Sequence, residues 1–324
     1  MANTQITING YVLPDGWQNE NSGNSEWGFA VKNGKQYFIK KLLDPVYPVN
    51  PEIMPEELFN ERRVLCEQFE AKFNNFYTCI NRASHGNLVR VNEFFRDGSR
   101  YYLVTDRING LSLSPEDVSR MDFDKKIMLL KSVAHCFNDL HSAGIVHFDV
   151  KPANILLQTS PRGYLTAKLI DFDSGFFRYE VLTPEELGGD LTYFAPETVR
   201  AICGEDVHPD EKADIFALGL MFHEYFCGKL PDFDTNEFEY AFDVILNDST
   251  MTIDSANLPE ELNELVSSML DPEPKNRPSA KDIVSKLETI PMPEIKAAPV
   301  PTAPSGGTVT GEKVDAWFSS AGDL

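Results

Sequence analysis

The sequence predicts an α+β fold in which a β-rich first part is followed by a larger helical part. In roughly the first hundred residues, short β-rich runs alternate with turn signals and enclose one helical run. After that the character changes, and long apolar segments have the length of buried helices. A β-rich part followed by a helical part is typical of proteins that keep strands and helices in separate lobes. The segments that predict buried helices are residues 125–141, 213–227 and 259–270.

A β-hairpin is predicted near the start of the chain. Its strands are residues 27–31 and 36–41, and Lys32-Asn33-Gly34-Lys35 separates them. Asn-Gly favours this tight turn because both of its central residues need a positive φ.

The helix of the first part is predicted over residues 56–69. Pro55 opens the run, acidic residues follow in the first turn, and the apolar residues have helical spacing. A second hairpin is then predicted from residues 88–95 and 101–105, which Asp97-Gly98 joins.

Composition limits the classes of function. The chain has 324 residues, of which 42% are hydrophobic, so it can bury a full core. Its net charge of -21 argues against a nucleic-acid partner, because binding phosphates needs clustered Lys and Arg. Five cysteines without a CxxC pair indicate reduced thiols. With no signal-like N-terminus and no long apolar run, we predict a cytoplasmic protein that does not bind membranes.

Two polar segments carry the chemistry. The first is His147-Phe148-Asp149-Val150-Lys151-Pro152-Ala153-Asn154, and the second is Leu169-Ile170-Asp171-Phe172-Asp173. Phosphoryl transfer needs a carboxylate to align the incoming hydroxyl, a cation to meet the γ-phosphoryl charge, and oxygen ligands for Mg²⁺. Asp149, Lys151, Asn154 and Asp171 supply these parts in that order. A polar loop between buried strands would explain any one of them, but the set of four favours phosphoryl transfer.

These segments resemble the catalytic loop (HRDxKxxN) and the magnesium loop (DFG) of the protein-kinase family. Ala195-Pro196-Glu197 resembles the APE motif, Asp214 and Gly219 match the DxxxxG helix, and Arg277 matches the arginine that pairs with the APE glutamate. The resemblance implies a bilobal protein-kinase-like fold, with a small β-rich N-lobe containing one helix and a larger helical C-lobe. The implied domains are an N-terminal extension (1–10), the N-lobe (11–108), the C-lobe (109–290) and a flexible Pro/Ala/Gly-rich tail (291–324).

The resemblance also implies an ATP site. Residues 23–30 are similar to the glycine-rich loop GxGxxGxV, whose backbone amides cover the ATP phosphates. Lys40 would contact the α- and β-phosphates, and Glu61 on the helix would be its partner. Because Phe38 stands where the family has a small alanine, either the nucleotide pocket is narrower or Lys41 is the functional lysine. The loop residues implied at the nucleotide are Gly23, Ser25, Gly28 and Ala30.

The remaining nucleotide contacts follow from the same resemblance. Thr105 falls at the gatekeeper position, and the backbone of Asp106, Arg107 and Ile108 would form the hinge that reads adenine. Leu156 completes this site. Asn154 and Asp171 would hold Mg²⁺, with Mn²⁺ as an alternative.

Three residues depart from the family pattern. Phe148 replaces the HRD arginine that grips a phosphate on the activation segment, which implies that activation-loop phosphorylation is not required. Asp173 replaces the DFG glycine, either because Asp tolerates a positive φ or as a second carboxylate near the metal. Asp190 replaces a threonine that bonds the catalytic aspartate and lysine, so substrate positioning differs.

Lys151 narrows the implied function, because tyrosine kinases and small-molecule kinases with similar motifs lack a lysine there. The expected activity is an ATP- and Mg²⁺-dependent transfer to Ser or Thr hydroxyls of proteins, with autophosphorylation and oligomeric state left open. The alternatives are a pseudokinase that acts as an interaction module and a small-molecule phosphotransferase.

Overall fold

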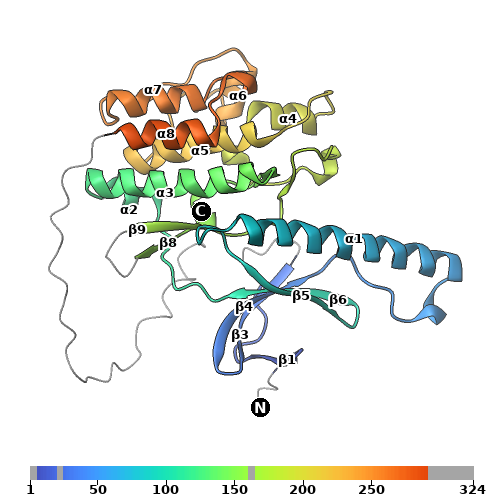
Figure 1. The fold of residues 1–324 in the computed structure, drawn as a ribbon. Helices are drawn as coiled ribbons and strands as arrows, with labels where there is room; N and C mark the ends of the chain where they lie inside the picture. The colour runs from blue at the N-terminus through green and yellow to red at the C-terminus, as the bar shows by residue number, and fades with distance from the viewer. Residues whose placement is uncertain (1–5, 20–24, 160–164, 291–324) are drawn as a thin grey trace, which may run out of the picture. The chain divides into compact units, whose positions relative to one another are not determined.

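The chain has the α+β fold that the sequence predicts. The computed structural model describes residues 6–19, 25–159 and 165–290. Contacts divide the chain after Pro291, and everything described below belongs to the unit before that point. Within this unit a sheet-rich N-terminal part precedes a helical part (Figure 1). Among the described helices, none has the length and apolar character needed to cross a bilayer.

The N-terminal sheet has six antiparallel strands in the order β1-β2-β3-β4-β6-β5. Both predicted hairpins are confirmed. Asn33 (φ 54°) and Gly34 (φ 76°) form the β3–β4 turn, and Gly98 (φ 59°) lies in the β5–β6 turn. The strands are β1 (Ile6–Ile8), β2 (Tyr11–Leu13), β3 (Ser25–Lys32), β4 (Lys35–Leu42), β5 (Val91–Asp97) and β6 (Arg100–Asp106).

The register of β3 against β4 decides which residues share a face of the sheet. Trp27 lies opposite Lys40, and Phe29 lies opposite Phe38. Because side chains alternate along a strand, these residues lie on one face and their neighbours lie on the other. The other face carries a buried cluster of Tyr11, Leu13, Ala30, Ile39, Tyr102 and Val104.

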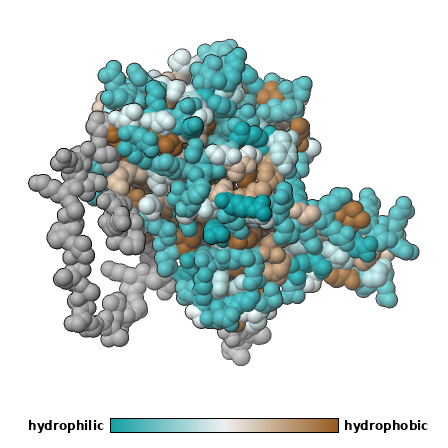
Figure 2. Space-filling model, viewed as in Figure 1, coloured by the Kyte–Doolittle hydropathy of each residue, from teal (hydrophilic) through white to brown (hydrophobic). Residues whose placement is uncertain are grey.

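Helix α1 (Glu56–Ala83) begins where predicted but continues well past Phe69, the predicted end. Phe73, Phe76, Tyr77 and Ile80 explain the difference, because they extend the apolar spacing of three and four residues. From Cys66 onward α1 packs on the Lys40 face of the sheet, where Phe69 and Phe73 join a cluster around Leu42, Cys66 and Tyr101. The first half extends outward, and its Leu58, Val64 and Leu65 are exposed on an otherwise hydrophilic surface (Figure 2).

The C-terminal part is mainly helical, and the three predicted buried helices are confirmed as α3, α5 and α7. Two small antiparallel pairs, β8–β9 and β7–β10, flank the functional loops. The helices are α2 (Pro115–Ser119), α3 (Phe123–Ser142), α4 (Pro196–Ile202), α5 (Glu211–Cys227), α6 (Ala241–Leu246), α7 (Glu260–Met269) and α8 (Ala280–Thr289). The strands are β7 (Ile145–Val146), β8 (Ile155–Thr159), β9 (Leu165–Leu169) and β10 (Phe176–Phe177). Short 3₁₀ helices cover Pro51–Ile53, Pro152–Asn154, Pro184–Glu186, Leu191–Tyr193 and Pro274–Asn276.

A buried ion pair joins the start of α4 to the loop before α8. Arg277 donates two parallel hydrogen bonds to the Glu197 carboxylate, at 2.6 and 2.9 Å. The exposed fraction of the two side chains is only 0% and 6%. Arg277 also donates to the backbone carbonyls of Asp271 and Lys212, so its charge is fully engaged by the protein.

Glu197→Ala should therefore destabilise the fold strongly. It leaves the Arg277 charge buried without its partner, and such a change costs about 3–5 kcal/mol of the free energy of unfolding. Denaturant unfolding followed by circular dichroism measures this loss. Glu93→Ala, which removes a partly exposed partner of Lys32, is the control and should cost much less. If the two variants lost the same free energy of unfolding, the Glu197–Arg277 pair would not be the strongly stabilising interaction assigned here.

Candidate active site

A single buried carboxylate holds the first functional loop, residues 147–154, which follows β7. Asp214 on α5 accepts hydrogen bonds from the backbone N–H groups of His147 and Phe148, both at 2.8 Å. The same carboxylate lies 2.9 Å from Nε2 of His141. Phe148 has a φ of 66°, which is an unfavourable conformation for an aromatic residue. Asp214 therefore fixes the shape of the loop just before Asp149.

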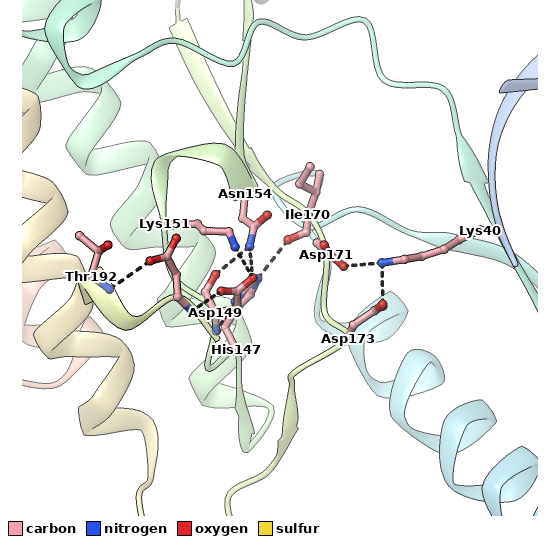
Figure 3. Close-up of polar contacts among 10 residues, drawn as sticks. Lys40, His147, Asp149, Lys151, Asn154, Ile170, Asp171, Asp173 and Thr192 are labelled. Carbon is pink, nitrogen blue, oxygen red and sulfur yellow. Dashed lines mark hydrogen bonds and ion pairs between the residues drawn. The ribbon is translucent and has the colours of Figure 1, made fainter. Parts of the chain in front are cut away.

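Three groups orient the carboxylate of Asp149 (Figure 3). The side-chain amide of Asn154 donates to it at 2.9 Å, and the ammonium of Lys151 lies 3.1 Å away. The backbone N–H of Asp190 donates to its other oxygen at 3.2 Å. Asp190 thus bonds Asp149 through its backbone, while its own carboxylate accepts from the N–H of Thr192. The loop brings Asp149, Lys151 and Asn154 together as the sequence predicts.

The second functional loop is joined directly to the first. The N–H of Ile170 donates to the carbonyl of Asn154 at 3.0 Å. The ring of His147 bonds through Nε2 to the carbonyl of Ile170 at 3.1 Å. Asp171, the next residue, therefore lies beside the Asn154 end of the first loop.

Lys40 reaches this second loop from the N-terminal sheet. Its ammonium lies 3.0 Å from the Asp171 carboxylate and 2.5 Å from that of Asp173. Only 8% of Lys40 is exposed. Lys41 instead pairs with Glu26 on the opposite face of the sheet. The geometry thus directs Lys40, rather than Lys41, to the loop that carries Asp171.

The charges around this loop act on one another. Burial opposes ionisation of Asp171, but the charge and hydrogen bond of Lys40 outweigh it, so the pKa of Asp171 lies below its usual value. Burial raises the pKa of Asp173; the charge of Lys40 opposes this effect, the charge of Asp171 adds to it, and the pKa lies above its usual value. On α1, burial and then the charges of Asp173 and Asp171 raise the pKa of Tyr77.

The residues at this point fit a hard divalent cation. The amide nitrogen of Asn154 is committed to Asp149, while its amide oxygen accepts no hydrogen bond from any residue that the structure describes. An amide oxygen beside an ionised Asp171 is a donor set that suits Mg²⁺. Within the described ranges there is no cluster of three or more His, Cys, Asp or Glu residues that could hold a metal alone. Such an ion would therefore take its other ligands from phosphate and water.

The structure gives the surroundings of Thr105, Asp106, Ile108 and Leu156, which are predicted at the nucleotide. Thr105, 6% exposed, is opposite Phe38 and therefore on the Lys40 face. Ile108 and Leu156 meet at Gly110, where an added Cβ would lie 3.4 and 3.1 Å from their side chains. The Asp106 side chain pairs with Lys35 at 2.7 Å.

Part of the predicted glycine-rich loop faces the other way. Ser25 shares the face of Lys40, but Gly28 and Ala30 lie on the opposite face of β3. Ala30 packs with Ile39, and a Cβ on Gly28 would lie 2.8 Å from the carbonyl oxygen of Gly16. The prediction placed Gly28 and Ala30 on the nucleotide side, but in a strand alternate residues lie on opposite faces, and these two do not share the face of Lys40. Gly23 lies outside the described residues.

The structure also does not bring Glu61 to Lys40. Glu61 is exposed on the outward half of α1, whereas Lys40 pairs with Asp171 and Asp173. The prediction chose Glu61 because residues 60–65 resemble helix C of the protein-kinase family. Since the helix continues to Ala83, its later turns are the ones that approach the loop.

Two aromatic groups surround the site, and sequence reasoning missed both as groups. Trp27, Phe29 and Phe38 contact one another on the Lys40 face, with ring centroids 5.8 to 6.2 Å apart. The second group lies at the loop that carries Asp149. There the ring of Phe148 packs edge-on against that of Phe176, with centroids 5.2 Å apart, and its centroid lies 6.5 Å from that of Phe194. The alternation of aromatic residues in β3 could have indicated the first group. No local pattern indicates the second, because its members are far apart in the sequence.

Comparisons with known proteins agree with this geometry. Residues 60–287 match the protein kinase domain family. The chain is 28% identical to a probable myosin light chain kinase of Dictyostelium discoideum over 66% of its own length and 71% of that protein. It is 30% identical to calcium-dependent protein kinase 4 of Plasmodium berghei, with 63% of this chain and 38% of that protein covered.

A third relative is the MAP kinase-interacting serine/threonine-protein kinase 2 of Xenopus laevis. The identity is 31%, over 45% of this chain and 33% of that protein. The chain thus spans only about a third of the length of two of these relatives. The family match, in contrast, covers both functional loops and the Glu197–Arg277 pair. The chain therefore belongs to the protein kinase domain family.

Proposed function

We propose that the chain is an ATP- and Mg²⁺-dependent serine/threonine kinase that phosphorylates protein hydroxyls. The observation that carries the proposal is the Asp149 carboxylate, held by Lys151, Asn154 and the N–H of Asp190, on a loop bonded to the one with Asp171. One relative carries serine/threonine specificity in its name, which supports the same acceptor class.

Each residue then has a chemical role. Asp149 orients the acceptor hydroxyl and takes its proton, because its carboxylate is already held in one direction. Lys151 lies beside it and meets the charge of the transferring group, while Lys40 meets the other phosphates. Asn154 and Asp171 would hold the metal ion, which, when bound, neutralises charge on the phosphate oxygens.

We further propose that activation does not require a phosphate on the activation segment. The support is the contact of Phe148 with Phe176 and Phe194. Phe176 lies near the start of the activation segment and Phe194 near its end, so the catalytic loop packs against the segment at two places. In that segment Arg178 already pairs with Glu211 and bonds the carbonyl of His141. Its charge is therefore already engaged by the protein.

One observation favours a second candidate, a pseudokinase that binds partners without transfer. Trp27, Phe29 and Phe38 place three aromatic rings on the Lys40 face, where the adenine ring would have to fit. A site narrowed in this way could exclude the nucleotide and leave only a docking function. The experiment below separates the two candidates.

Asp149→Asn should reduce transfer from labelled ATP to a generic basic protein by about 10²–10⁴-fold in kcat, because it removes the proton acceptor. The KM for ATP should stay close to that of the wild-type protein, since Asp149 is not in the nucleotide site. Asp206→Asn, at an exposed aspartate, is the matched control and should retain full activity.

The outcome for the unchanged chain decides between candidates. Thermal stabilisation by ATP and Mg²⁺ with no transfer to any acceptor would favour the pseudokinase. Transfer to a sugar or an aminoglycoside but never to protein would favour a small-molecule phosphotransferase. Full turnover by Asp149→Asn would refute its role as the base.

Asp171→Ala should abolish the Mg²⁺ dependence of ATP binding, because it removes the ionised ligand of the predicted metal site. Isothermal titration with ATP, in Mg²⁺ and in EDTA, measures this dependence. Asp97→Ala, at the exposed end of β5, is the control and should bind ATP as the wild-type chain does. If Asp171→Ala still bound ATP more tightly in Mg²⁺ than in EDTA, the residue would not be a metal ligand.

Removing all phosphate from the protein should leave its kcat unchanged, because the Phe148 contacts need no phosphate. The measurement compares kcat before and after phosphatase treatment, with mass spectrometry to verify that residues 171–197 carry no phosphate. Phe148→Ala should lower kcat in both samples. An activity lost on phosphatase treatment and regained on rephosphorylation would contradict the proposal.

A further inference from the structure

The ammonium of Lys40 has two carboxylate partners, and both come from one short loop. Asp171 lies at 3.0 Å and Asp173 at 2.5 Å (Figure 3). The Lys40 side chain is only 10% exposed, whereas the two carboxylates keep 39% and 37% of their side-chain exposure. A buried ammonium is strongly unfavourable without an opposite charge, so this pairing determines where Lys40 can point.

Helix α1 supplies no such charge, although it packs on the same face of the sheet. Its acids Glu56, Glu57, Glu61 and Glu67 are exposed. Glu70 is engaged elsewhere, since it accepts from the Tyr101 hydroxyl at 2.9 Å and lies 3.3 Å from Arg96. The complete helix is described, so every acid it carries is accounted for.

The turns of α1 that approach the loop are aromatic instead. A Cβ on Gly175 would lie 2.8 Å from the Phe76 ring, and the next residue, Tyr77, is buried. Where α1 approaches the loop it therefore offers an aromatic ring, and the anionic partners of Lys40 come from the loop.

The two carboxylates cannot have the same role once a metal is bound. The metal site proposed above uses Asp171 together with the amide oxygen of Asn154. A carboxylate that turns to a divalent cation has less charge left for Lys40, and Asp173 is the nearer of the two partners. The geometry leaves Asp173 as the residue that keeps Lys40 paired.

We infer that Asp173 is a positioning residue that holds the ammonium of Lys40 toward the ATP phosphates and leaves Asp171 for the metal. The inference rests on the proposed kinase function. It means that the anchor of Lys40 and the metal ligand lie on one loop, so the ATP lysine is aligned without any acid from α1.

The first test is a double-mutant cycle on Tm in the nucleotide-free protein, with Lys40→Met, Asp173→Asn and the combination. Paired residues give a combined Tm loss clearly different from the sum of the single losses. Lys32→Met with Glu93→Gln, a more exposed pair in the same sheet, is the control cycle and should be close to additive. Additive losses for Lys40 and Asp173 would overturn the inference.

The second test is steady-state kinetics at saturating Mg²⁺. Asp173→Asn should raise the KM for ATP by about tenfold, equal to about 1.4 kcal/mol, with a smaller change in kcat. Asp173→Glu keeps the charge and should recover part of the loss, which a merely structural role of Asp173 would not produce. Asp173→Ser serves as a second carboxylate deletion if the Asn variant folds poorly.

Two kinetic results would also overturn the inference. If Asp173→Asn raised only the Mg²⁺ concentration needed for half-maximal activity, Asp173 would be a metal ligand. If Glu61→Gln and not Asp173→Asn raised the KM for ATP, the helix acid would be the partner. The Tm cycle needs no nucleotide, so it tests the pairing separately from the kinase function. Non-additive Tm losses in a protein that shows no transfer activity would refute the kinase function but support the pairing of Lys40 with Asp173.

Discussion

The carboxylate of Asp214 is the interaction on which the functional site depends. It lies at the buried start of α5 and accepts the backbone N–H groups of His147 and Phe148. These two bonds hold Phe148 at a positive φ that an aromatic residue rarely adopts, and the cost of that conformation is offset by satisfying a buried charge. Asp149 follows directly, so the backbone position from which its carboxylate extends is set by a residue from another part of the chain.

Local chemistry explains what the sequence could predict. The Asn33–Gly34 turn and the buried helices follow from rules that need only neighbouring residues, and the spacing of Asp149, Asn154 and Asp171 is itself a local pattern. Glu61 was mistaken because the partner of Lys40 depends on which turn of α1 approaches the loop. Gly28 and Ala30 were mistaken because alternate residues in a strand lie on opposite faces, and no local signal fixes which of them share the face of Lys40.

Three departures from the family pattern are each accompanied by a compensating contact nearby. Phe148 has aromatic neighbours where an arginine would need a phosphate. Asp190 bonds Asp149 through its backbone N–H rather than its side chain. Asp173 supplies a carboxylate to Lys40 where α1 presents aromatic rings. The charge lost at Phe148 is thus matched by packing, the charge added at Asp173 by an opposite charge, and the charge added at Asp190 by the backbone N–H of Thr192.

The aromatic contact at Phe148 changes how the activation segment responds to its surroundings. An arginine–phosphate contact weakens as salt screens it, within a Debye length of about 8 Å at physiological ionic strength. Contact between apolar rings is not screened, and it loses strength on cooling because the hydrophobic effect is largely entropic near room temperature. The part of the segment's order that comes from the Phe148 contacts therefore depends on temperature rather than on ionic strength, whereas the Arg178–Glu211 pair is open to screening.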